Sequence, residues 1–198
     1  MKAAVDIRRA VFLDRDGILI RDDGVVSRLE GIDVLPGVPS ALKRLKEAGL
    51  ALPVVSNQSV VARGVLTESE VKELQAEVER RILQAGGPAL DGFYFCPHHP
   101  KGTLEAYRSH CDCRKPGIGL LTRAAGDLGV DLQSSFMVGD RPTDIVAGRR
   151  AGCRTVWVQT GQHAAPLIET AEPMPADVQA DHVCADLAAA VDWILSQP

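Results

Sequence analysis

The sequence predicts an α/β fold in which a parallel sheet carries helices on both faces. Short apolar runs alternate with segments whose apolar residues recur every three to four positions. Such an alternation of strands and helices builds a parallel sheet that is covered on both sides. Polar clusters directly follow several of the apolar runs. This order places them at the carboxyl ends of the strands, where ligands bind in open sheets of this kind.

The predicted strands are short and apolar. Pro53 falls within one of them, and because proline cannot donate to a hydrogen-bond ladder, it predicts an edge position or a local irregularity there. The strands are expected at Ala10–Leu13, Leu50–Val55, Gly92–Phe95, Phe136–Val138 and Thr155–Val158.

The predicted helices have one apolar face each and recognisable ends. Thr67 and Glu70 fit a capping box at the start of a helix that ends at Gly86. Glycine also follows three of the other helices and predicts where they stop. These other helices are expected over Val38–Ala48, Leu120–Leu128, Thr143–Arg150 and Ala185–Leu195.

Length and composition predict one domain over residues 1–198. The chain has 198 residues, of which 45% are hydrophobic and 24% charged, so it can bury a real core. The formal net charge of −4 argues against nucleic-acid binding driven by overall charge. Polar residues and Pro53 interrupt the most apolar stretch, and the N-terminus lacks the apolar core of a signal peptide. We therefore expect a cytoplasmic monomer with no nucleic-acid or membrane partner.

Paired carboxylates follow two of the predicted strands. Asp14 and Asp16 stand two residues apart before Gly17, and such a pair can supply a nucleophile or metal ligand and a general acid/base. A turn with an Asx cap explains the pair equally well. Asp140 and Asp144 follow the fourth strand, where either would also serve as a helix cap. Together, the four carboxylates supply hard oxygen ligands suited to Mg²⁺.

Groups that bind anions complete a candidate site. Ser56 and Asn57 follow the second strand and offer a hydroxyl, an amide and backbone N–H groups, and Lys115 adds a positive charge. A metal, two carboxylates, this cradle and a lysine form a site for phosphoryl transfer, in which catalysis is mostly positioning and charge stabilisation.

The order of these motifs resembles the haloacid dehalogenase (HAD) superfamily of phosphatases, whose sheet is Rossmann-like. The resemblance implies that Asp14 is the nucleophile and forms an aspartyl-phosphate, and that Asp16 protonates the leaving oxygen and then deprotonates the attacking water. It also implies that Mg²⁺ is held by Asp14, the backbone carbonyl of Asp16, and Asp140. Ile18 departs from the usual threonine, which affects one local hydrogen bond but no catalytic group.

Three cysteines and a histidine lie close together in the chain. Cys96, His98, Cys111 and Cys113 offer a closed tetrahedral set for structural Zn²⁺. Clustered cysteines in a reducing compartment indicate a metal rather than disulfides, although a loop with a reactive thiol is the alternative interpretation. His99 and His110 are nearby competitors for the histidine position. We expect residues 96–113 to form a zinc-binding insert.

The segment from Cys96 to Lys115 is more basic than the rest of the chain. This is typical either of a solvated loop or of a loop that recognises an anionic substrate. Its basic residues are Lys101, Arg108, Arg114 and Lys115, against Glu105 and Asp112.

The cysteine loop and Asn57-Gln58-Ser59 resemble the D-glycero-D-manno-heptose 1,7-bisphosphate phosphatases, over nearly the whole chain. The resemblance implies hydrolysis of the C7 phosphate of a sugar bisphosphate, in a route to nucleotide-activated heptose for lipopolysaccharide core or S-layer glycans. It also implies that the zinc loop stands in for a cap domain. Substrate contacts are implied for Ser56, Asn57, Gln58, Arg63, Arg114 and Lys115. Val60-Val61 and Arg141 replace the usual Gly-Ile and Lys, which bears on substrate preference.

Other functions compete with this interpretation. A histidinol-phosphate phosphatase shares the HAD motifs and a similar zinc loop. A catalytically inactive, zinc-stabilised binding protein is disfavoured by the intact motifs, and a polynucleotide end-phosphatase by the 4% aromatic content. Hydrolysis of an aryl phosphate with and without Mg²⁺ separates an enzyme from a binder.

Overall fold

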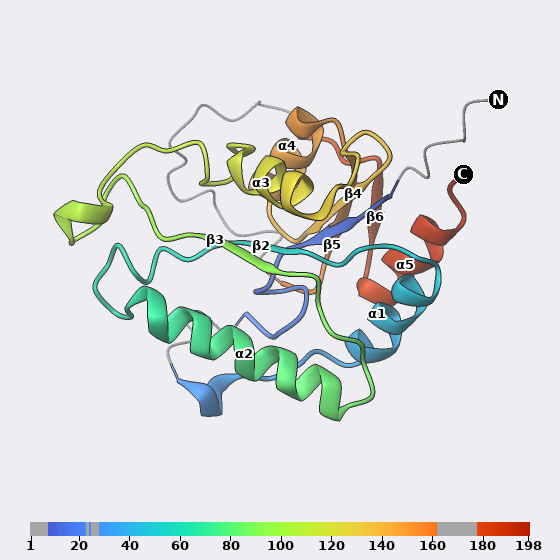
Figure 1. Cartoon of the computed structure of the whole chain (residues 1–198), viewed down its shortest axis with the longest axis horizontal. Helices are drawn as coiled ribbons and strands as arrows, with labels where there is room; N and C mark the ends of the chain where they lie inside the picture. Colours follow the sequence, from blue (N-terminus) through green and yellow to red (C-terminus); the bar gives the residue numbers. More distant parts are fainter. Residues whose placement is uncertain (1–7, 23, 25–27, 162–177) are drawn as a thin grey trace.

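A parallel sheet of six strands lies between two layers of helices in the computed structural model, which describes residues 8–22, 24, 28–161 and 178–198 (Figure 1). The strand order is β3-β2-β1-β4-β5-β6, so the chain begins in the middle of the sheet and extends it first to one side and then to the other. The predicted α/β class is confirmed. The strands are β1 (Val11–Leu13), β2 (Val54–Asn57), β3 (Phe93–Cys96), β4 (Phe136–Gly139), β5 (Arg154–Val158) and β6 (His182–Cys184).

The predicted helices are all present, with ends within a few residues of those expected. The capping box at α2 is confirmed, since Thr67 Oγ1 accepts from the Glu70 N–H at 3.2 Å and the Glu70 carboxylate accepts from the Thr67 N–H at 2.7 Å. The helices are α1 (Val38–Glu47), α2 (Glu68–Gln84), α3 (Gly119–Leu128), α4 (Pro142–Ala151) and α5 (Leu187–Leu195), with short 3₁₀ turns at Leu29–Gly31 and Glu105–Tyr107. None of these helices in the described ranges is long and apolar enough to span a bilayer.

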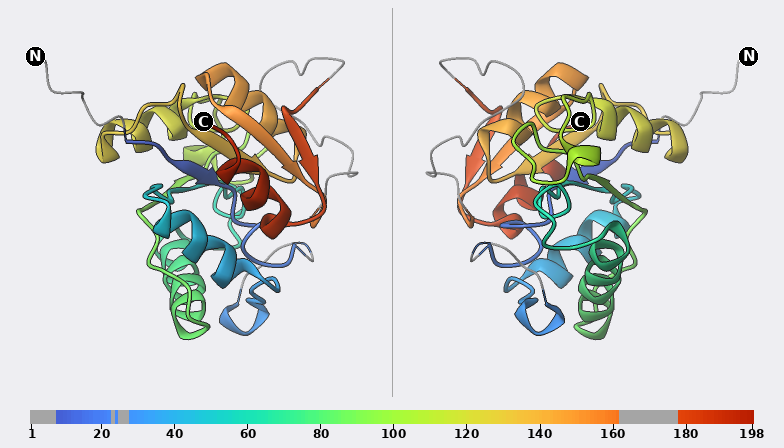
Figure 2. Two further views of the ribbon diagram at one scale, coloured as in Figure 1. Left: turned by 90° about the vertical axis from the view of Figure 1, so that its right-hand side faces the viewer. Right: turned by 90° about the vertical axis from the view of Figure 1, so that its left-hand side faces the viewer.

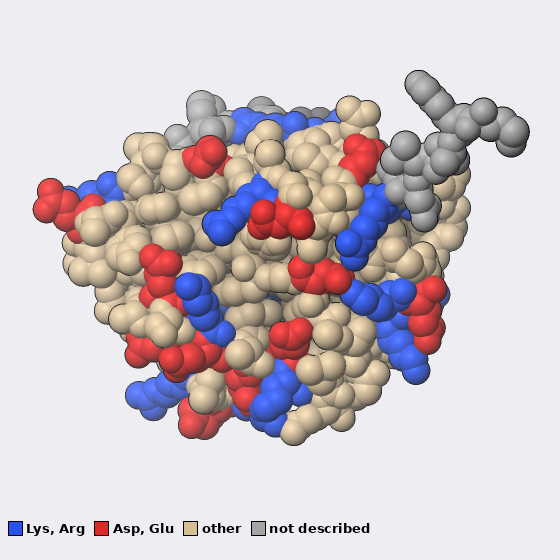
Figure 3. Space-filling view, viewed as in Figure 1, with Lys and Arg blue, Asp and Glu red and all other residues tan. Residues whose placement is uncertain are grey.

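The strands bury alternate side chains on opposite faces of the sheet. Val11 and Leu13 pack in one cluster with α1, α2 and α5, whereas Phe12 packs in another with α3 and α4. This is the period of two that a strand imposes on its side chains. Figure 2 shows the two helical layers on either side of the sheet. On the face seen in Figure 3, acidic and basic side chains are interspersed, so the charge there is locally balanced.

Pro53 does not place its strand at an edge, because β2 lies between β1 and β3. The irregularity expected there is present instead. The Leu52 N–H donates to Asp91 Oδ2 at 2.7 Å rather than to a strand, and the Pro53 carbonyl accepts from the Leu13 N–H at 2.9 Å. As a result β2 begins at Val54 and not at Leu50.

The edge strand β6 was not expected from the sequence. It has three residues and pairs with β5 in parallel, and its central residue, Val183, is 52% exposed. A run of three residues that begins with a histidine carries almost no periodic signal, so the pairing is set by the chain's tertiary context.

Candidate active site

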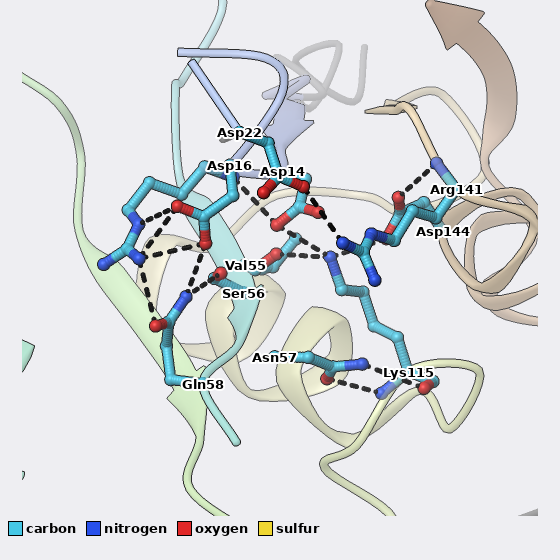
Figure 4. Close-up of polar contacts among 11 residues, drawn as sticks. Asp14, Asp16, Asp22, Val55, Ser56, Asn57, Gln58, Lys115, Arg141 and Asp144 are labelled. Atoms are coloured by element: carbon cyan, nitrogen blue, oxygen red, sulfur yellow. Dashed lines mark hydrogen bonds and ion pairs between the residues drawn. The ribbon is translucent and has the colours of Figure 1, made fainter. Parts of the chain in front are cut away.

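The candidate site lies at the carboxyl edge of the three central strands. Asp14 follows β1, Asn57 ends β2, and Asp140 follows β4. Because β1 pairs with both β2 and β4 in parallel, the ends of these strands meet at one edge. Figure 4 shows the side chains that converge there.

Three buried carboxylates form the centre of the site. Asp14, Asp140 and Asp144 each place an oxygen within 4.8 Å of the others. Two glycines allow the chain to close around Asp140: an added Cβ would lie 2.7 Å from its Oδ2 at Gly17 and 2.2 Å at Gly161. Any side chain larger than a hydrogen atom at position 17 or 161 would therefore clash with this carboxylate. The sequence left Asp144 open between helix cap and ligand; its Oδ2 does accept from the Arg141 N–H at the start of α4.

Lys115 bridges two of these carboxylates. Its side chain is 1% exposed, and Nζ lies 3.1 Å from Asp14 Oδ1 and 2.6 Å from Asp144 Oδ1. The same ammonium donates to the Val55 carbonyl at 2.8 Å. One lysine among three buried carboxylates leaves an excess of negative charge, which is costly without a further cation. The donor set therefore fits a divalent cation with hard oxygen ligands, such as Mg²⁺.

Asn57 fixes the main chain of Lys115. Its Oδ1 accepts from the Lys115 N–H at 3.0 Å, and its Nδ2 donates to the Lys115 carbonyl at 3.0 Å. Both polar atoms of the Asn57 side chain are thus used by the protein itself. These bonds give Asn57 a positioning role, which the sequence does not reveal because it joins residues far apart in the chain. The contact expected between this side chain and the substrate stays a prediction.

Burial raises the pKa of Asp14 to about 6, and the negative charges of Asp144 and Asp16 add to the rise, while Lys115 opposes it. A carboxyl group at this position needs positive charge beside it to remain ionised at neutral pH. The carboxylate form is also the one that can act as a nucleophile or as a metal ligand. Both considerations favour a cation at the carboxylate cluster.

Asp16 is turned away from the carboxylate cluster. Among the described residues, it lies outside the group of carboxylates within 4.8 Å of one another. Its oxygens instead contact the guanidinium of Arg15 and the amide of Gln58 (Figure 4). Gln58 is 3% exposed and also donates to Ser56 Oγ at 2.8 Å. Ser56 and Gln58, expected to touch substrate, are thus bonded to each other and to the acidic motif.

The cysteine cluster assembles at the end of β3. The Sγ atoms of Cys96, Cys111 and Cys113 lie 3.1 to 3.5 Å apart, and His98 Nδ1 lies 3.4 Å from Cys113 Sγ. When sulfur ligands surround zinc tetrahedrally at about 2.3 Å, their separations from one another are slightly larger than the separations observed here. The four groups therefore fit the ion. The contact with Cys96 lowers the pKa of Cys113 to about 5, so that one thiolate forms readily. Thiolates are the form that binds zinc.

His98, rather than His99, belongs to this group. His99 is 4% exposed, and its Nδ1 accepts from the Lys101 N–H at 3.1 Å within the loop. The cysteine cluster is joined to the candidate site through Arg114, whose Nη1 donates to the His98 carbonyl at 3.2 Å.

Three arginines, Arg63, Arg114 and Arg141, lie close enough for their charges to interact. Burial lowers the pKa of Arg114, and the positive charges of Arg63 and Arg141 add to this effect. Arg63 itself is exposed. Arg141 pairs with Asp22, whose side chain is only 3% exposed, at 3.0 Å. No sequence pattern pointed to Asp22, because it lies in a polar stretch without periodicity.

Ile18 and Val60-Val61, which depart from the family pattern, pack among apolar side chains. Ile18 is fully buried in the cluster beneath α1, and Val60 and Val61 pack with Val71 of α2. Of the three departures, only Arg141 presents a polar group near the site.

Comparisons with known proteins agree with this geometry. A family model described as HAD-hydrolase-like matches residues 112–190. The D-glycero-beta-D-manno-heptose-1,7-bisphosphate 7-phosphatase of Haemophilus ducreyi is 42% identical over 78% of this chain and 85% of its own. The D-glycero-D-manno-heptose-1,7-bisphosphate 7-phosphatase of Thermosynechococcus vestitus is 40% identical over 94% of this chain and 95% of its own.

A solved structure shares the fold over almost the full length. The D,D-heptose 1,7-bisphosphate phosphatase of B. bronchiseptica, crystallised with magnesium and phosphate, superposes with a TM-score of 0.79 at 32% identity. The match covers 97% of this chain and 100% of that one.

Proposed function

This chain belongs to the D-glycero-D-manno-heptose-1,7-bisphosphate 7-phosphatase family of HAD-like hydrolases, and we infer from that membership that it removes the C7 phosphate of this sugar bisphosphate. The observation that supports this best is the cluster of Asp14, Asp140 and Asp144 around the buried Lys115 at the carboxyl edge of the sheet. Such a cluster supplies a nucleophile, a cation site and a fixed positive charge for a phosphoryl group.

We propose that Asp14 attacks phosphorus. Its oxygen forms a bond to phosphorus while the bond from phosphorus to the C7 oxygen breaks, and the proton of Asp16 goes to that oxygen. In the second half, Asp16 takes a proton from water, the water oxygen bonds to phosphorus, and the bond to Asp14 breaks. Lys115 stays paired with Asp14 and faces the negative charge of the phosphoryl group. Mg²⁺ held by Asp14, the Asp16 carbonyl and Asp140 would neutralise phosphoryl charge.

Short loops, and not a cap domain, are proposed to select the substrate. When the C7 phosphate lies at Asp14, the second phosphate of the sugar would contact Arg63, with Arg114 beside it. Binding energy from a remote charged group can lower the barrier at the reacting centre as well as raise affinity.

We expect the heptose 1,7-bisphosphate to be hydrolysed with a kcat/KM at least about a hundredfold above that of heptose 7-phosphate, which corresponds to about 2.7 kcal/mol. Arg63→Gln should abolish most of the preference for the bisphosphate over the 7-phosphate. Arg123→Gln, on the exposed face of α3, should leave that preference unchanged. Phosphorus NMR should show that the C1 phosphate survives. Faster turnover of histidinol phosphate than of the bisphosphate would assign the enzyme to that competing function.

We propose that Cys96, His98, Cys111 and Cys113 hold structural Zn²⁺. A set of four protein ligands leaves no position for water, so the ion would shape the loop and take no part in the chemistry. The contact between Arg114 and the His98 carbonyl would transmit the loop's shape to the substrate site.

Elemental analysis should therefore find one zinc ion per chain. Cys111→Ala is expected to lose the zinc and to raise KM at least about tenfold, with a smaller effect on kcat, because the loop that carries Arg114 loses its support. Cys184→Ala, outside the cluster, is the matched control and should keep the metal. Full activity in zinc-free protein would contradict this assignment.

We also propose that residues 1–198 act as one domain and as a cytoplasmic monomer. The position of segment 96–113, between β3 and α3, supports its description as an insert in that domain. Ser56 is proposed to act on substrate binding indirectly, through the hydrogen bond that it accepts from Gln58.

A further inference from the structure

Trp157 of β5 donates a hydrogen bond to the main chain of a residue in the carboxylate cluster. Its Nε1–H donates to the Asp140 carbonyl at 3.0 Å. Strands β4 and β5 pair in parallel, and the last pair of their ladder is Gly139 with Trp157. Asp140 thus lies just beyond the ladder, where a side chain supplies the donor to its carbonyl. An indole nitrogen can only donate, so it cannot compete with a carboxylate for a cation.

The peptide group between Asp140 and Arg141 is held at both of its polar atoms. Its carbonyl accepts from Trp157, and its N–H donates to Asp144 Oδ2 at 3.0 Å (Figure 4). On the other side of Asp140, the strand ladder fixes Gly139. The main chain is therefore fixed before and after Asp140. Because the two backbone dihedrals of a residue set the direction of its side chain, the direction of the Asp140 carboxylate is fixed as well.

Little space is left for the Asp140 carboxylate to turn. Asp140 is fully buried, and a Cβ added at Gly17 or Gly161 would lie 2.7 Å or 2.2 Å from its Oδ2. The main chain of both glycines therefore lies close to this oxygen. A carboxylate confined in this way follows its own main chain, so that a shift of the peptide group after Asp140 would displace its oxygens relative to Asp14.

Core packing does not account for a tryptophan at this position. Val156 and Val158, its neighbours in β5, are buried in the apolar core, whereas Trp157 is half-buried. In the described part of the chain, Trp157 is absent from all three apolar clusters. Tryptophan combines a large apolar body with one polar N–H, and here the N–H makes the contact that a purely apolar residue could not make.

We propose that Trp157 is a positioning residue for the divalent cation. Through the peptide group that follows Asp140, its indole N–H holds the Asp140 carboxylate in the orientation that binds Mg²⁺. This inference rests on the cation site proposed above and adds a residue that acts through the ligand and not on the metal. Groups that orient a metal ligand from outside the coordination sphere change metal affinity about ten- to a hundredfold when they are removed.

Magnesium affinity provides the first test. Isothermal titration calorimetry of the substrate-free protein should give a Kd for Mg²⁺ at least about tenfold higher in Trp157→Phe, because phenylalanine keeps an aromatic ring but cannot donate. At saturating Mg²⁺ the kcat of this variant for the heptose bisphosphate should return to within about threefold of the wild type, since the reacting groups are intact. Trp193→Phe, in α5 and packed on Phe136, is the control and should leave the Kd unchanged. A kcat lowered at every Mg²⁺ concentration with an unchanged Kd would contradict the positioning role.

The wild-type protein provides a second test, which no folding defect can affect. The chain has two tryptophans, so an isotopically labelled sample gives two indole N–H signals by NMR, and Trp193→Phe assigns them. Addition of Mg²⁺ should shift the Trp157 signal and leave the Trp193 signal in place. A Trp157 signal that stays in place while calorimetry shows Mg²⁺ binding would overturn the inference.

Asp140→Asn separates this inference from the proposed function. The variant should lose most of its affinity for Mg²⁺, because it removes the ligand itself. If it binds Mg²⁺ as the wild type does, the proposed cation site is wrong. If Asp140→Asn loses Mg²⁺ but Trp157→Phe binds it with the wild-type Kd, the cation site stands and Trp157 has no positioning role.

Discussion

Asp14→Asn is expected to lower kcat at least about a thousandfold, which corresponds to about 4 kcal/mol of barrier. The amide has nearly the shape of the carboxylate but is a poor nucleophile, so the covalent step fails. Turnover of the bisphosphate and trapping of the phosphoenzyme measure the effect. Asp127→Asn, on the exposed side of α3, is the control and should remain active. Retention of more than about a tenth of the wild-type rate would contradict the nucleophile assignment.

The same substitution should stabilise the protein in Mg²⁺-free buffer. The native-state pKa of Asp14 is raised from 3.8 to about 6, mainly by burial, so its ionisation weakens the folded state. This cost is absent below about pH 4, grows as the pH rises towards 6, and is complete above it; at about 1.4 kcal/mol per pKa unit it reaches at most about 3 kcal/mol. Asparagine carries no charge, so the gain in Tm should appear at pH 8 and vanish near pH 4. A lower Tm at pH 8 would contradict this account.

Lys115→Met is expected to produce the second-largest change, in activity and in stability together. The three clustered carboxylates would lose the lysine that bridges two of them, and breaking such a buried pair costs about 3 to 5 kcal/mol. We expect kcat/KM to fall at least about a hundredfold, as when one electrostatic contact to a reacting group is removed.

Thermal unfolding with and without Mg²⁺ checks the electrostatic origin of that loss. Because a divalent cation compensates the same charges, Mg²⁺ should raise the Tm of Lys115→Met more than that of the wild type. Lys43→Met, at an exposed position of α1, should leave both the Tm and its response to Mg²⁺ unchanged. An equal response of Lys115→Met and wild type to Mg²⁺ would show that the lysine does not balance the carboxylates.

The sequence predicted the parts of the molecule that local patterns determine. Asp14 and Asp140 could be placed together because parallel strands end at one edge. The roles of Gln58 and Asp22 could not be predicted, since each depends on a partner that the fold brings from a distant part of the chain, Asp16 in one case and Arg141 in the other. The position of β2 inside the sheet was likewise hidden, because Asp91 supplies the hydrogen bond that the strand lacks before Pro53.

The pairing of the Asn57 side chain with the Lys115 main chain has a consequence for how such enzymes diversify. The segment between Cys96 and Lys115 leaves the sheet at the end of β3 and is tied back to the end of β2 by that pair of hydrogen bonds. Both ends of the segment are therefore anchored to the sheet independently of its middle. The stretch 99–110, between the two pairs of cluster residues, can therefore vary in length and composition while Lys115 keeps its place. New specificities can arise on this scaffold without rebuilding the chemistry.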